Sequence, residues 1–223
     1  MRTLLLLLPL AVLSAQTPKM SSSKMAAKAP AAKAPALKQD YKVSGNPNAP
    51  ITVEAYTDYE CPHCARFYEE FMPQFTKDYI QTGKVKFIHR DFPLPMHPHA
   101  VMAAKYADAA GELGYYDVAV QQIFKTQDTW SVNGKNTGDI DAVLTQVIPP
   151  GAMQKIREIV KTTSPIDAEI AKDVSDAENR DHVPSTPTIV VVTKSGKREP
   201  ISSILEMPYS IFRKYLDGKI AGQ

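Results

Sequence analysis

A strand, a helix and a second strand are expected one after another between residues 51 and 92, joined by short connections. Both strands are runs rich in β-branched residues. The segment between them carries an aromatic residue at every fourth position, as one face of a helix requires: Phe67, Phe71, Phe75 and Tyr79. Pro73 is expected to kink this helix and Gly83 to end it. Because strands joined by one helix run parallel, the unit restricts the chain to an α/β fold.

Both cysteines of the 223-residue chain stand where the first strand meets the helix. A disulfide between Cys61 and Cys64 would close so short a loop that it could stabilise the fold very little. Disulfide exchange, in contrast, needs a thiolate, and the amino end of a helix favours negative charge. Pro62 suits a first helical turn, and His63 adds a donor or a positive charge beside Cys61. We therefore expect Cys61 to attack and be attacked, and Cys64 to resolve the mixed disulfide.

A metal site is the main alternative use of the two thiols. A closed zinc site needs four ligands, and no second cysteine pair or histidine pair is placed to complete one. A copper site could add Met96, His97 and His99. Residues 96–99 are better explained as a loop that enters a helix, so neither a metal nor another cofactor is expected.

The remaining polar side chains near the dithiol have structural interpretations. Asp58 and Glu60 are expected to be exposed, so that water screens their effect on Cys61. His89 and His182 have no partner that can be named from the sequence. Both histidines are expected at the surface or as satisfied residues at strand ends.

The beginning of the chain has the layout of a secretory signal peptide over residues 1–15, with one arginine, an apolar run and then small residues. An uncleaved anchor is the alternative, because Leu13 is bulky for the third position before a cleavage site after Ala15. Residues 16–40, rich in alanine, lysine and proline, are expected to be a disordered spacer, and residues 41–223 one folded domain. The net charge of the whole chain is +2, and the first 40 residues alone carry +5. The domain therefore has a net charge of about −3. No nucleic-acid partner is therefore expected.

A helical block and then a hairpin follow the first strand–helix–strand unit. Residues 97–180 show helical patterns throughout, and Ser164 is expected to cap the last of these helices. Residues 187–193 and 199–205 are expected to form an antiparallel hairpin across a four-residue turn. A final helix is expected over residues 208–219, ending at Gly218.

This order of elements resembles the DsbA-like thiol:disulfide oxidoreductases of the thioredoxin superfamily. The resemblance covers Tyr41 to the C-terminus and depends on four motifs in this order: "CPHC", "YIQTGKVKFIHRDFPL", "YYDVAVQQIF" and "VPSTPT". It implies an α/β thioredoxin fold in which a helical insertion, about 97–180, separates the βαβ half from the ββα half.

The resemblance also implies functional residues away from the dithiol. Pro187 matches a cis-proline that faces the two cysteines, which would turn Thr186 toward Cys61 and let its backbone pair with an extended substrate chain. An ordinary trans proline at a strand start is the alternative. Relatives place a buried acid six residues before the first cysteine, where it relays the proton of the resolving thiol, but Ala55 stands there. Either the adjacent Glu54 takes this role through a bulge, or water does.

The leading hypothesis is an exported oxidase that donates its Cys61–Cys64 disulfide to exported proteins with free thiols. By resemblance, a quinone-linked membrane partner would reoxidise it. The alternatives are a periplasmic disulfide reductase or isomerase and a metal-handling, thioredoxin-like binding module. Isomerases of this superfamily usually carry a dimerisation domain, which the polar spacer cannot provide, so a monomer is expected.

Overall fold

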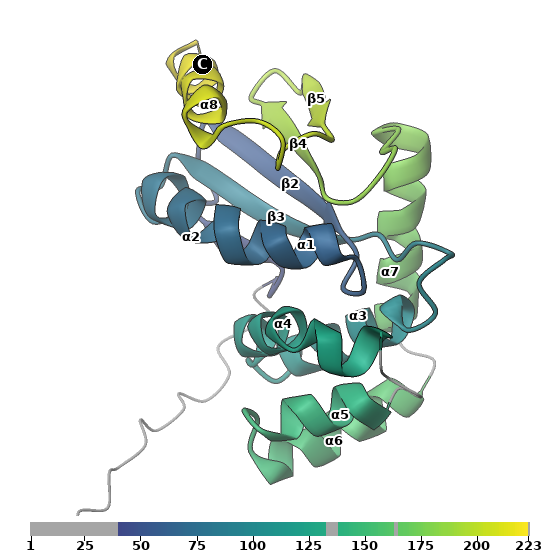
Figure 1. Cartoon of the computed structure of the whole chain (residues 1–223). Helices are drawn as coiled ribbons and strands as arrows, with labels where there is room; N and C mark the ends of the chain where they lie inside the picture. The colour runs from purple at the N-terminus through teal and green to yellow at the C-terminus, as the bar shows by residue number, and fades with distance from the viewer. Residues whose placement is uncertain (1–39, 133–137, 163–164, 223) are drawn as a thin grey trace, which may run out of the picture. The chain divides into compact units, whose positions relative to one another are not determined.

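A five-stranded mixed sheet, with strand order β1-β3-β2-β4-β5, lies at the centre of the fold (Figure 1). As expected, β2 (Ile51–Thr57) and β3 (Val85–Asp91) run parallel, and β4 (Thr188–Thr193) pairs antiparallel with β2 and with β5 (Arg198–Ile201). A further strand, β1 (Val43–Gly45), pairs antiparallel with β3 and was not expected. It has three residues with exposed or half-buried side chains, so no alternating pattern marks it in the sequence.

The computed structural model describes residues 40–132, 138–162 and 165–222. The signal peptide expected at residues 1–15, almost all of the spacer at 16–40, and Ser164 lie outside the described residues. No helix in the described part of the chain is long and apolar enough to cross a membrane.

Helical segments connect and cover the strands. In chain order they are α1 (Pro62–Arg66), η1 (Phe67–Phe71), α2 (Met72–Phe75), η2 (Thr76–Ile80), α3 (Ala100–Gly111), α4 (Tyr116–Lys125), η3 (Asp128–Val132), α5 (Gly138–Thr145), α6 (Pro150–Lys161), α7 (Pro165–Ser175), η4 (Asp176–Arg180) and α8 (Tyr209–Ala221), where η marks π-helical turns. The helical block expected over residues 97–180 is confirmed for its described residues.

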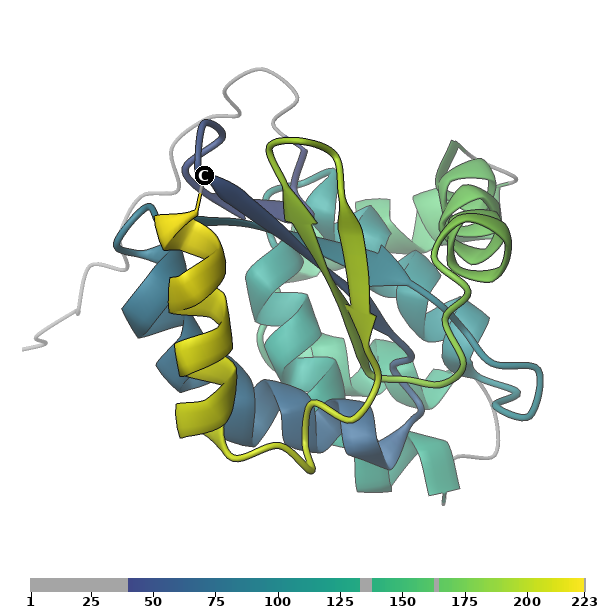
Figure 2. The same ribbon diagram turned by 90° about the horizontal axis from the view of Figure 1, so that it is seen from above.

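The first four segments form one helix with two π-helical stretches, η1 in its middle and η2 at its end. The N–H group of Met72 bonds to the carbonyl of Phe67, five residues back, directly before Pro73. Proline has no N–H group to continue an α-helical ladder, so the wider turn and the change of direction in Figure 2 have a local cause. Gly83 follows the last turn with a φ of +73°, so the expected end of this helix is confirmed.

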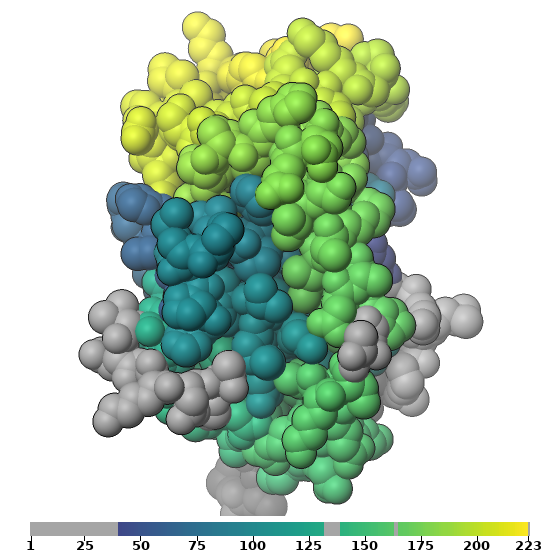
Figure 3. Space-filling view, turned by 90° about the vertical axis from the view of Figure 1, so that its right-hand side faces the viewer, coloured from purple at the N-terminus to yellow at the C-terminus, as the bar shows by residue number. Residues whose placement is uncertain are grey.

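Different helices cover the two faces of the sheet. Ala55 on β2 belongs to an apolar cluster with Phe71 and Phe212, which places the dithiol helix and α8 on this face. Tyr56, the next residue, packs with Ala177 and Val183 on the opposite face, below α7 and η4. Figure 3 shows the segment after β3 beside α7 and η4. The alternation of strand side chains thus separates two apolar layers.

The helical insertion packs around an apolar cluster that contains Trp130, Ile123 and Leu144 and that also includes both cysteines. It also meets the start of the domain at Gly111, where an added Cβ would lie 2.4 Å from the ring of Tyr41. Only glycine allows so close an approach.

The ends of two C-terminal elements differ from expectation. Helix α8 does not end at Gly218 but continues to Ala221, because Ile220 packs against the core and Lys219 pairs with Glu199. These contacts outweigh the cost of a glycine within a helix, about 1 kcal/mol. Strand β5 ends at Ile201, four residues earlier than expected, and the chain then turns away from the sheet.

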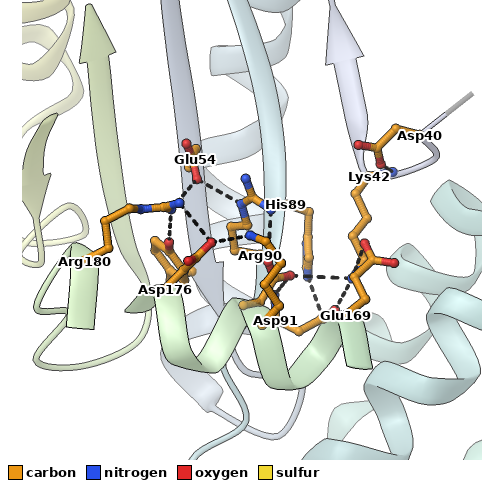
Figure 4. A network of polar contacts seen from close by, with 12 residues as sticks. Asp40, Lys42, Glu54, His89, Arg90, Asp91, Glu169, Asp176 and Arg180 are labelled. Carbon is orange, nitrogen blue, oxygen red and sulfur yellow. Dashed lines mark hydrogen bonds and ion pairs between the residues drawn. The ribbon is translucent and has the colours of Figure 1, made fainter. Parts of the chain in front are cut away.

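Buried charges connect the sheet to the insertion (Figure 4). The Nζ atom of Lys42 lies within 3.7 Å of four carboxylates, two of them on the neighbouring α7: Asp91, Asp108, Glu169 and Asp173. A second group of charges surrounds Glu54 on β2. Its carboxylate forms ion pairs with three arginines: Arg90, Arg180 and Arg198. Since Arg90 also bonds to Asp173, the two groups form one network.

Candidate active site

The two cysteines lie at the junction of β2 and α1, as expected. Cys61 is the N-cap residue, with extended backbone angles, and Pro62 occupies the first turn of α1. Cys61 is 5% exposed and Cys64 is fully buried, and both are free thiols. Cys61 therefore keeps a small exposed area, whereas Cys64 has none.

The surroundings of Cys61 stabilise its thiolate. A hydrogen bond from the Cys64 thiol is the largest influence, and together with the Thr186 side chain and the backbone N–H groups of Cys64 and His63 it lowers the pKa of Cys61 to about 5, against the opposing effect of burial. The unpaired N–H groups of the first helical turn add a smaller part of this stabilisation than the two side chains do. His63 thus contributes its backbone, while a role for its exposed side chain stays a prediction.

The second thiol has the opposite character. Burial, together with the charge of Cys61, raises the pKa of Cys64 well above its ordinary value. The backbone N–H group of Asp58 donates to the Cys64 sulfur at 3.4 Å and partly offsets this. At neutral pH the pair therefore consists of one thiolate and one thiol, in the order needed for Cys61 to act as the nucleophile.

Thr186 and Pro187 face the dithiol across a cis peptide bond, as expected from the resemblance. The Cys61 sulfur lies 3.5 Å from the Thr186 carbonyl oxygen, to which the thiol form can donate. The Thr186 hydroxyl is buried without a hydrogen-bond partner of normal geometry among the described residues. Backbone pairing of Thr186 with a substrate stays a proposal.

Asp58 and Glu60 are buried, and their expected exposure was wrong. The Asp58 carboxylate accepts hydrogen bonds from the N–H groups of Glu60 and Leu94, and it contacts the His97 ring at 2.7 Å. Glu60 accepts from the N–H group of His99 at 2.7 Å. These acids hold the segment after β3 against the dithiol loop, which requires contacts between residues more than thirty positions apart. Burial raises the pKa of Asp58.

Gln127 is a site residue that the sequence does not reveal. Its amide donates to the carbonyl oxygens of Tyr59, at 2.7 Å, and Cys61, at 3.0 Å. The insertion therefore fixes the backbone that carries the nucleophile. A glutamine near the end of a helical segment has no local signal that would predict this role.

Of the two alternatives for the acid missing at Ala55, the one in which Glu54 takes its place through a bulge is wrong. Strand β2 shows unbroken pairing with both neighbours, so Glu54 points away from the face of Ala55. Its carboxylate is bound by three arginines on the opposite side of the sheet. Glu54 is part of the structural charge network and does not reach the dithiol.

The remaining histidines were expected to have structural roles. His97 and His99 belong to a loop that enters α3, and Met96 is 74% exposed, which agrees with the structural interpretation. Among the described residues no group of three histidine, cysteine or acidic side chains could hold a metal ion. His182 is exposed, and His89 is 1% exposed with three polar neighbours, so the two residues follow the two expected alternatives of a surface and a satisfied histidine.

Comparisons with known proteins agree with this geometry. A family model described as Thioredoxin matches residues 38–203. A Rickettsia bellii protein named as a protein-disulfide oxidoreductase is 31% identical over 93 residues, 42% of this chain and 35% of that protein. Disulfide bond formation protein D of Bacillus subtilis is 27% identical over 157 residues, 68% of each chain. The chain thus matches about a third of the length of the Rickettsia relative.

The fold also has solved counterparts. The crystal structure of Wolbachia pipientis alpha-DsbA1 superposes with a TM-score of 0.67 at 22% identity, and the match covers 81% of this chain and 91% of that one. At this level of identity the likeness concerns the fold.

Proposed function

The chain belongs to the thioredoxin family and has the fold of DsbA proteins, helical insertion included, and from this premise we propose that it is an exported thiol:disulfide oxidoreductase that donates its Cys61–Cys64 disulfide to other proteins. The observation that carries the proposal is the unequal dithiol, with a Cys61 pKa of about 5 and a Cys64 pKa well above the ordinary range. The names of the Rickettsia and Bacillus relatives support the same reaction class.

The reaction would proceed in two exchanges. A substrate thiolate attacks the Cys61 sulfur, the Cys61–Cys64 bond breaks, and Cys64 leaves with the electron pair and takes up a proton. A second substrate thiolate then attacks the substrate sulfur of the mixed disulfide and releases Cys61 as a thiolate. The substrate gains one disulfide, and the enzyme becomes the dithiol described above.

The low pKa of Cys61 favours the oxidising direction. An environment that stabilises the Cys61 thiolate stabilises the reduced protein, and this makes the disulfide easier to reduce. A disulfide-bearing, quinone-linked membrane partner would restore it. Exported proteins with free thiols are the proposed substrates, and the periplasm or another extracytoplasmic space is the proposed location. We further propose that the protein acts as a monomer without metal or cofactor.

Thr186 and Pro187 form the proposed substrate platform. The Thr186 carbonyl oxygen lies 3.5 Å from the Cys61 sulfur, which supports a substrate path in which an extended chain that reaches Cys61 also passes the Thr186 backbone. Such a chain could bind by main-chain hydrogen bonds, which accept many sequences.

The decisive experiment is the reduction potential, measured by equilibrating the protein with glutathione buffers. An oxidase is expected near the DsbA value of about −120 mV, and a reductase near the thioredoxin value of about −270 mV. The Cys61→Ser, Cys64→Ser double variant provides the blank. Export is tested separately, because the mature protein isolated from its native compartment should begin near residue 16. A potential close to that of thioredoxin would favour the reductase alternative.

A further inference from the structure

The Cys64 thiol needs a group that takes up and returns its proton. Neither of the two strand positions considered from the sequence supplies such a group. Ala55 has no ionisable group, and Glu54 is bound by arginines on the far side of the sheet. Asp58 contacts Cys64 only through its backbone N–H group, and its carboxylate already has three partners. Cys64 itself is fully buried.

His89 lies next to Ala55, the position at which relatives carry the acid. It is the register partner of Ala55 on the parallel strand β3, so its side chain points to the same face of the sheet as the dithiol helix. Its ring stacks on Tyr59, with centroids 5.4 Å apart, and it is buried. A buried imidazole is thus present beside the position that relatives fill with a carboxyl group.

The hydrogen bonds of His89 define a chain of three side chains. The Tyr68 hydroxyl lies 2.5 Å from Nδ1, and Nε2 lies 3.2 Å from the Asp91 carboxylate. Because a carboxylate only accepts, Nε2 carries the hydrogen and Nδ1 accepts from the tyrosine. Burial favours the neutral acid, but Lys42 and His89 together lower the pKa of Asp91 below its usual range. Asp91 therefore stays charged and orients the imidazole, as in the hydroxyl–histidine–carboxylate arrangement of hydrolases.

Tyr68 connects this chain to the dithiol. It stands one helical turn after Cys64 on the same helix, and it packs against the apolar cluster that contains Cys64. Residues four apart on a helix share one face of it, so the side chains of Cys64 and Tyr68 are neighbours there. Burial raises the pKa of Tyr68 well above its ordinary value, and an ionised Cys64 raises it further. The Tyr68 ring is fixed by stacking on Phe124, with centroids 4.4 Å apart.

We propose that Tyr68, His89 and Asp91 form the proton relay of Cys64, in place of the carboxyl group that Ala55 lacks; this inference rests on the proposed function. When Cys64 attacks a mixed disulfide on Cys61, its proton passes to the Tyr68 oxygen and the tyrosine proton passes to Nδ1 of His89. The new Cys61–Cys64 bond forms as the partner sulfur leaves with the electron pair. In substrate oxidation Cys64 leaves as a thiolate, and the proton returns by the same route.

The His89 ring has polar or aromatic neighbours on every side, of which only Tyr68 and Asp91 belong to the proposed relay. Thr57 and Tyr59 face it from the end of β2 and the following loop, Tyr68 from η1, Tyr116 from α4 and Asp91 from β3. Lys42 and, behind it, Asp108 set the charge of Asp91 from outside this shell.

The test separates the two steps of one reaction. Reduced protein is mixed with glutathione disulfide and quenched with acid at short intervals, and the mixed disulfide and the Cys61–Cys64 disulfide are quantified by mass spectrometry. His89→Gln should form the mixed disulfide at the normal rate but resolve it more slowly, on the order of 10²-fold for the loss of a positioned base. Its resolution rate should keep rising with pH where that of the native protein levels off.

Two further variants keep the test decisive. Tyr68→Phe retains the stacked ring and removes only the hydroxyl, so it should slow resolution similarly even if His89→Gln folds poorly. Tyr116→Phe, another buried tyrosine against the His89 ring, should leave resolution unchanged. Native resolution rates and pH profiles in both His89→Gln and Tyr68→Phe would overturn the relay while leaving the proposed function intact. Failure of the native protein to form any mixed disulfide would overturn the proposed function itself.

Discussion

The low pKa of Cys61 makes the stability of the reduced protein depend on pH in a way that the oxidised protein cannot share. The folded state holds the Cys61 pKa at about 5, against 9.0 for an unperturbed thiol. A lowered pKa adds stability that is complete above the unfolded value and is lost as the pH falls through the folded value. Between these limits the slope is about 1.4 kcal/mol per pH unit.

The expected magnitude follows from the two units between pH 5 and pH 7. The reduced protein should gain about 2 kcal/mol relative to the oxidised protein over this interval, somewhat less than the full slope because Cys61 is half ionised at pH 5. Cys64 does not disturb the comparison, because its pKa is raised and it stays protonated in both the folded and the unfolded chain at these pH values. All other titrating groups are common to both redox forms and cancel in the difference.

The assay is denaturant unfolding of the reduced and oxidised proteins at half-unit pH steps, together with the ultraviolet absorbance of the thiolate. The reduced Cys61→Ser variant should lose the dependence of stability on pH. If the His63 side chain helps the backbone N–H groups to stabilise the Cys61 thiolate, His63→Ala should shift the midpoint of the absorbance titration to higher pH. A flat stability difference between pH 5 and pH 8, with an absorbance midpoint near that of a free thiol, would refute the reasoning.

Three further perturbations have defined outcomes. Cys64→Ala should accumulate mixed disulfides with exported proteins, visible as adducts on non-reducing gels, whereas equal trapping by Cys61→Ala would reverse the assigned roles. Gln127→Leu should destabilise the protein by about 1–3 kcal/mol in denaturant unfolding, because two buried carbonyls lose their donor, and an unchanged midpoint would contradict this. Lys42→Met should cost about 3–5 kcal/mol near neutral pH and less in acid, where the buried carboxylates around it can protonate; a loss that grows in acid would contradict the ion-pair account.

The predictions that the sequence supports depend on local signals. The aromatic spacing around Phe71 and the β-branched runs specify the strand–helix–strand unit, and the position of Cys61 at its junction specifies the chemistry. Helical periodicity likewise predicts the insertion, since each helix buries one face of itself. In all these cases a pattern within about twenty residues determines the outcome.

The errors concern residues whose environment is determined by distant partners. Asp58 looks like a solvated loop acid until the segment after β3 supplies its donors. Lys42 carries no signal in the sequence of the carboxylates from α3 and α7 that surround it. For His89 the expected alternative of a satisfied residue near a strand end is correct, but its three polar partners come from β2, η1 and β3 and could not be named from the sequence. Burial of a polar side chain depends on tertiary contacts, which periodicity does not encode.

The topology of the sheet explains why such distant segments meet at the dithiol. Strand β2 ends at the dithiol loop, and parallel pairing of Thr57 with Asp91 makes β3 end at the same edge. Antiparallel pairing of Tyr56 with Thr188 makes β4 begin there. The chain leaving β3 therefore passes the dithiol before it enters the insertion, and the chain returning from the insertion passes it again at Thr186. A helical insertion between these two strands has both of its ends at the active-site edge, so its packing, through Gln127 as well, can position Cys61 directly. The turn between β4 and β5 lies at the far end of β4, and substitutions there should leave the Cys61 pKa unchanged.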